Sequence, residues 1–86
     1  MTAVTAAVIP FPLARRLHLI QRQAEYALCL RPEKAEQHIQ RQLQCQADAL
    51  VRRGVAPDLI QRELAGMETA IRAAMWRLTF DMPEQA

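Results

Sequence analysis

The segment PDLIQRELAGMETAIRAAMWRLTF, residues 57–80, decides the fold, because it carries the strongest helical periodicity in the chain. Large apolar residues recur every three or four positions along it, which places them on one face of an α-helix. These residues are Ile60, Leu64, Met67, Ile71, Met75 and Leu78. Pro57 and Asp58 suit the first turn of a helix, and the Asp81-Met82-Pro83 segment suits its end. The pattern predicts one long helix over residues 57–80.

The opposite face of this helix carries a single charged side chain, Arg62, where a charged face would normally meet solvent. It carries small residues and two aromatic residues instead, namely Ala65, Gly66, Thr69, Ala73, Trp76 and Phe80. Gly66 in mid-helix costs about 1 kcal/mol relative to Ala, which is easier to explain if another backbone approaches closely there. We therefore expect the helix to be covered on both sides. Trp76 and Phe80 are expected to be buried together, against Ile9 and Phe11 or against a second chain.

Two further helices precede this one. Residues 32–53 place one apolar stripe on a single face and end at Gly54, a typical helix stop; the stripe is Ala35, Ile39, Leu43, Ala47 and Leu50. Residues 12–30 predict a helix whose core face is Leu13, Leu17, Ile20, Ala24, Ala27 and Leu28. A second apolar stripe lies beside that face and comprises Leu19, Tyr26 and Leu30.

The N-terminal residues are not predicted to be helical. In the segment Val8-Ile9-Pro10-Phe11-Pro12, the residue before each proline favours an extended backbone. We therefore predict an all-α protein: a three-helix bundle with an N-terminal extended arm and a long C-terminal helix. The arm covers residues 1–11, the helical domain residues 12–82 and a short tail residues 83–86. Short connections favour antiparallel neighbours.

Composition removes several classes of function. The 86-residue chain contains no serine and two glycines, Gly54 and Gly66, so it has neither a serine nucleophile nor a glycine-rich phosphate loop. The carboxylates are scattered like solvated helix charges, so we expect no enzyme and no catalytic residue. No apolar run reaches the roughly 18 residues of a membrane helix. Two cysteines make no disulfide framework, which favours a cytoplasmic protein with reduced thiols.

Metal and cofactor sites are not expected either. The four candidate ligands are His18, Cys29, His38 and Cys45. None of them forms the closely spaced pair that a structural zinc site uses. We therefore expect either cysteine to be replaceable by alanine and chelators to leave stability unchanged.

Arginine is prominent, since ten of the eleven basic residues are Arg, although the net charge is only +2. Guanidinium groups suit phosphate recognition, so a nucleic-acid-binding regulator stays open; its residues would be Arg15, Arg16, Arg22, Arg52 and Arg53. Residues 49–64 resemble a degenerate helix-turn-helix around Gly54-Val55. Two features weaken that interpretation. Leu50 stands where a small residue is usual, and the second helix carries the acidic residues Asp58 and Glu63 near its start.

A set of short motifs resembles a known family. They are VIPFPLARR (8–16), RQL (41–43), QAD (46–48), RGV (53–55) and MWRL (75–78). The chain is similar, over residues 8–80, to a family of small uncharacterised proteins, a domain of unknown function, found chiefly in alphaproteobacteria. The resemblance implies no activity.

The sequence thus favours a non-enzymatic helical protein-interaction module with a regulatory or adaptor role. Its expected contact residues are Leu19, Tyr26, Leu30, Ala65, Thr69, Ala73, Trp76 and Phe80. The simplest partner is a second copy, because two-fold dimers are the commonest oligomers; another protein is the alternative. A phage-type small inhibitor of a host nuclease or defence complex is a further hypothesis that the size and the lack of catalytic groups allow.

Overall fold

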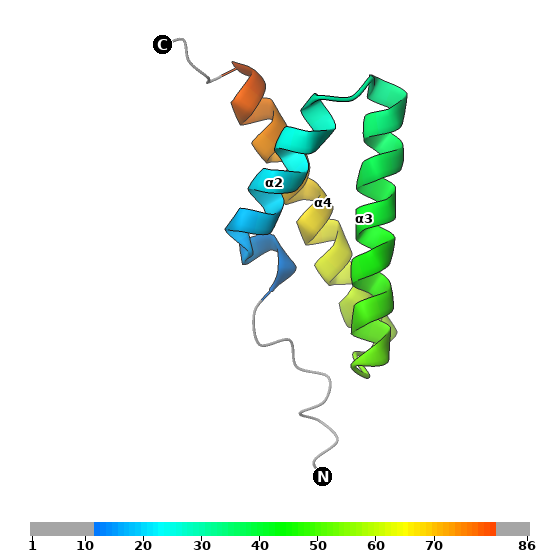
Figure 1. Ribbon diagram of the computed structural model, residues 1–86. Helices are drawn as coiled ribbons and strands as arrows, with labels where there is room; N and C mark the ends of the chain where they lie inside the picture. Colours follow the sequence, from blue (N-terminus) through cyan, green and yellow to red (C-terminus); the bar gives the residue numbers. More distant parts are fainter. Residues whose placement is uncertain (1–11, 81–86) are drawn as a thin grey trace.

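The structure is a computed structural model, and it describes residues 12–80. This part of the chain is all-α, as predicted: a short 3-10 helix η1 (Leu13–Arg15) precedes α2 (Leu17–Leu28), α3 (Pro32–Arg52) and α4 (Pro57–Phe80). Successive long helices run in opposite directions, and α4 passes diagonally behind α2 and α3 (Figure 1). The proposed arm, residues 1–11, and the tail, residues 83–86, lie outside the described residues.

The core is aliphatic and small-sided. Met67 and Ile71 of α4 and Ile39 of α3 are fully buried, and so are Ala24 and Ala27 of α2. Alanines at a helix crossing let the two backbones approach closely, which explains how short α2 packs against α4. The six-residue apolar stripe predicted for α4 is confirmed: three of its members are buried, and the others pack against the cluster.

Gly54 ends α3 in a C-terminal capping motif that begins the connection to α4. The N–H of Gly54 donates to the carbonyl of Val51 at 3.0 Å, and that of Val55 donates to the carbonyl of Leu50 at 3.1 Å. This pair of hydrogen bonds is the Schellman motif, which needs a left-handed residue, and Gly54 has φ 81°. Leu50 and Val55 are both buried beside the turn, so the turn also anchors two core side chains.

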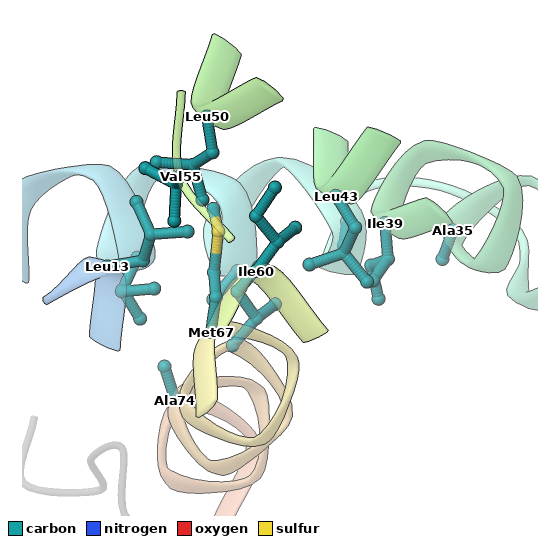
Figure 2. Packing of buried hydrophobic residues seen from close by; sticks show 13 residues of the cluster. Leu13, Ala35, Ile39, Leu43, Leu50, Val55, Ile60, Met67 and Ala74 are labelled. Carbon is teal, nitrogen blue, oxygen red and sulfur yellow. The ribbon is translucent and has the colours of Figure 1, made fainter. Parts of the chain in front are cut away.

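The helix predicted over residues 12–30 is interrupted, and that prediction was wrong at its start. Arg16 leaves the helical region with φ −84° and ψ 79°, which separates η1 from α2. The break turns Leu13 into the core, where it is 1% exposed and points into the same cluster as Met67 (Figure 2). Leu17, also expected in the core, begins α2 on the flank of the buried face formed by Ile20, Ala24 and Ala27, and it is 72% exposed. Leu28, likewise expected in the core, is exposed at the end of α2.

A carboxylate of α4 holds η1 in place. Glu63 Oε1 accepts a hydrogen bond of 2.9 Å from the backbone N–H of Leu13, a donor that η1 itself leaves unpaired. Ala14 then lies over Gly66, so that a Cβ added to this glycine would come within 3.7 Å of the Ala14 Cβ. The segment over Gly66 is therefore η1, but the close approach of another backbone expected there is not found among the described residues, because the contact is an ordinary side-chain one that leaves room for a methyl group.

Candidate interaction surface

The side of α4 turned away from the core stripe is largely open. Five uncharged residues on it are exposed, C-terminal to the exposed Arg62, and we call them the outer face of α4: Ala65, Thr69, Ala73, Trp76 and Phe80. At 100° per residue they fall within an arc of about 80°. Gly66 lies at the edge of this arc and is the part of the back that η1 covers. This side of α4 was expected to be covered. Among the described residues, a covering segment is present at Gly66 and absent along the five residues of the outer face.

The two aromatic residues of the outer face pack on each other. The ring centroids of Trp76 and Phe80 are 4.2 Å apart with the rings tilted at 43°, as expected for residues one turn apart. Both remain well exposed, Trp76 at 64% and Phe80 at 62%. The burial predicted for Trp76 is therefore not provided by residues 12–80. Ile9 and Phe11, its expected neighbours within the chain, lie outside the described residues.

A shallow hollow of about 270 Å³ adjoins the aromatic pair. Its lining comes from α2 and α4 and comprises Leu28, Arg72, Met75, Trp76, Thr79 and Phe80. Leu28 was missed as a surface residue because the sequence pattern placed it in the core. The signal that could have found it is the helix phase: counted from the buried pair Ile20 and Ala27, Leu28 falls to one side of the core face.

Arg72, at the border of the outer face, is drawn towards α3. Its guanidinium donates to both carboxylate oxygens of Glu36 on α3, at 2.7 and 2.9 Å, and to Glu68 at 2.8 Å. Hydrogen bonds from Arg72 hold the pKa of the Glu36 carboxyl below its usual range, and the two carboxylates raise the pKa of Arg72. Arg72 is thus paired within the chain by two carboxylates, and the five residues of the outer face are themselves uncharged.

The second predicted stripe does not form an open surface. Leu19 and Leu30 are partly buried and pack against the chain's own core. Tyr26 alone is exposed, and its ring lies against His38 of α3 with centroids 4.6 Å apart. His38 is hydrogen-bonded to Gln23 of α2, and burial together with the nearby Arg41 lowers its pKa. These residues therefore join α2 to α3, and the stripe is separate from the outer face of α4.

The arginines predicted for nucleic acid fall into two groups. Arg15, Arg16 and Arg22 line one wide, open hollow of about 730 Å³ together with Leu17, His18 and Leu19. Arg52 and Arg53 lie at the end of α3 and are not among the described residues that line this hollow. Arg16 precedes α2 without a side-chain cap on that helix. The structure thus brings together three of the five predicted arginines.

The other chemical candidates stay apart. Within residues 12–80, no three His, Cys, Asp or Glu side chains gather closely enough to hold a metal ion. Cys29 and Cys45 are both exposed free thiols. No helix among the described residues is long and apolar enough to span a bilayer.

Comparison with known proteins gives a family and nothing finer. Neither the curated proteins nor the solved structures yield a significant match to this chain. A family model does match, and it spans residues 4–84 of the 86. That span covers η1 and all three long helices, including the open face of α4. The chain therefore belongs to the Family of unknown function DUF6074.

Proposed function

We propose that the protein is a small non-enzymatic interaction module that binds another protein chain through the outer face of α4, in a regulatory or adaptor role. The observation that carries the proposal is the exposed, stacked pair Trp76 and Phe80 beside Leu28. Tryptophan is enriched among residues that dominate binding energy, and such residues cluster in apolar patches that a partner can desolvate. Exposed free thiols at Cys29 and Cys45 fit work in the reducing cytoplasm.

The packing around the outer face of α4 supports a binding role for Trp76 and Phe80 over a purely structural one. Within residues 12–80, the core closes without any aromatic side chain, since its buried members are aliphatic residues and Met67. Trp76 and Phe80 are thus dispensable for filling the core, yet they occupy the open side of the longest helix. Burying large aromatic side chains contributes a few kcal/mol, and a partner chain is what would supply that burial here.

The test is site-specific photo-cross-linking in living cells. A photoreactive amino acid is placed at Thr69, on the outer face, and in a matched variant at Val51, an exposed apolar position on α3. We expect discrete protein adducts from the Thr69 variant and few from the Val51 variant. Replacing Trp76 and Phe80 by Ala should remove the Thr69 adducts. Equal adduct yields from both positions would overturn the proposal.

A second candidate function rests on the three clustered arginines. Arg15 and Arg16 lie just before the first turn of α2, where the helix dipole disfavours cations. An anionic ligand such as a nucleic-acid phosphate would relieve that repulsion. The discriminating measurement is a mobility shift of labelled DNA or RNA across a salt series, comparing the native chain with the variant in which Arg15, Arg16 and Arg22 are Ala. A salt-dependent shift that the variant loses would support this alternative.

A further inference from the structure

We propose that the partner on the outer face of α4 is a second copy of this chain, docked so that the two α4 helices run antiparallel about a two-fold axis near Arg72 and Ala73. The inference rests on the proposed function, because it names the occupant of the same face. The observation behind it is the order of large and small residues along that face. When two copies of the face run antiparallel, the large residues of one copy meet the small residues of the other.

The complementarity lies in the spacing of the five residues. Ala65 lies as far before the midpoint between Arg72 and Ala73 as Phe80 lies after it. Thr69 and Trp76 are placed symmetrically about the same point, and Ala73 adjoins it. In an antiparallel pair, each residue faces its mirror position on the other helix. Trp76 of one copy therefore meets Thr69 of the other, and Phe80 meets Ala65.

The sizes of the residues favour this pairing over a parallel one. The two large side chains lie in the C-terminal part of the face and the small ones in the N-terminal part. Antiparallel docking sets each aromatic ring over small side chains, so the backbones approach closely and the rings are covered. Parallel docking would stack Trp76 on Trp76 and leave a gap between the alanines, which forfeits dispersion contacts.

Charge is compatible with the same arrangement. Glu36 and Glu68 hold the Arg72 guanidinium at the α3 border, which keeps the two copies of Arg72 from presenting bare charges to each other at the axis. Arg62 lies almost one turn before Ala65 and so falls beyond the symmetric segment. From Ala65 to Phe80 the seam is about 22 Å long at 1.5 Å per residue. A seam of that length is short for a permanent dimer, so we expect reversible association in the micromolar range.

Cysteine cross-linking tests both the relative orientation and the register of the two α4 helices in the proposed dimer. The background variant carries Cys29→Ser and Cys45→Ser, which removes the two native thiols. In this background, Ala73→Cys lies beside the axis and should form a disulfide with its own copy under mild oxidation. Ala65→Cys should not cross-link to itself, because the two copies would lie about 22 Å apart, but it should cross-link to Phe80→Cys in a mixture. Self-cross-linking at Ala65→Cys with none at Ala73→Cys would overturn the antiparallel arrangement.

Sedimentation separates failure of this inference from failure of the proposed function. We expect the native chain to shift from the mass of one 9.8 kDa chain to that of two as its concentration rises. Trp76→Ala should weaken the dimer at least about 30-fold, as for other aromatic hot spots, while Leu17→Ala, an exposed control, leaves it unchanged. A single-chain mass at every concentration would overturn self-pairing. The Thr69 cross-linking experiment would then still decide whether a different protein binds the face.

Discussion

The two glycines of the chain should respond in opposite directions to the same substitution. Gly66 sits in the middle of α4, where glycine costs about 1 kcal/mol relative to alanine. An added Cβ would meet Ala14 at 3.7 Å, an ordinary van der Waals distance, so η1 need not move. We therefore expect Gly66→Ala to stabilise the protein by about 1 kcal/mol. For a chain of this size, that corresponds to a rise in Tm of about 4–8 °C.

Gly54→Ala is the matched comparison. The space around Gly54 is open, with no atom within 4 Å of a Cβ built there. Its φ of 81° is nevertheless a left-handed conformation, which costs an alanine roughly 1–2 kcal/mol. The Tm should therefore fall, although nothing clashes. Thermal unfolding followed by far-ultraviolet circular dichroism measures both variants at one protein concentration. A lower Tm for Gly66→Ala would refute the reasoning, because it would mean that η1 packs on α4 too tightly for a methyl group.

Three further predictions concern the N-terminal packing and the α2–α3 contact. Glu63→Ala leaves the partly buried N–H of Leu13 without its acceptor, so we expect a loss of about 1 kcal/mol and fast hydrogen exchange of that amide; slow exchange would contradict it. Leu13→Ala should cost about 2–5 kcal/mol as a buried residue, whereas Leu17→Ala should stay within about 0.5 kcal/mol, and urea titration compares them. Burial lowers the pKa of His38 in the folded chain below its ordinary 6.5. The unfolded chain therefore binds more protons at this site, so the free energy of unfolding should fall as the pH drops below 6.5. His38→Gln should flatten this slope, and an NMR titration placing the His38 pKa above 6.5 would contradict the sign.

The fold could be predicted from the sequence where the signals were local. Pro57 and the six-residue stripe gave α4 its bounds, and Pro32 and Gly54 did so for α3, because proline and glycine act on the backbone at their own positions. The interruption at Arg16 could not be predicted, because its cause is distant. Leu13 is held by Glu63, fifty residues further along the chain, and no periodicity within residues 12–30 reports that contact.

The candidate surface was predicted in part for the same reason. The outer face of α4 follows from helical geometry alone, and its five residues are exposed in the structure. Leu19 and Leu30 were assigned to a binding stripe, but they are used to pack the chain's own core. Leu28 went unnoticed because the sequence pattern grouped it with the core face, although it lies to one side of Ile20 and Ala27 and is exposed beside Trp76. Which apolar stripe meets the core depends on the angle at which two helices cross, and that angle is a property of the assembled bundle.

The exposed position of Trp76, the only tryptophan in the chain, has a spectroscopic consequence. Indole emission depends on contact with water, and residues 12–80 of the folded single chain leave Trp76 64% exposed. Its emission should therefore change little when heat or urea melts the helices, so fluorescence would report almost none of the unfolding that circular dichroism detects. Covering the ring with another protein would shift the emission to shorter wavelengths. Trp76 is thus a built-in optical probe of docking, one that is nearly silent about folding.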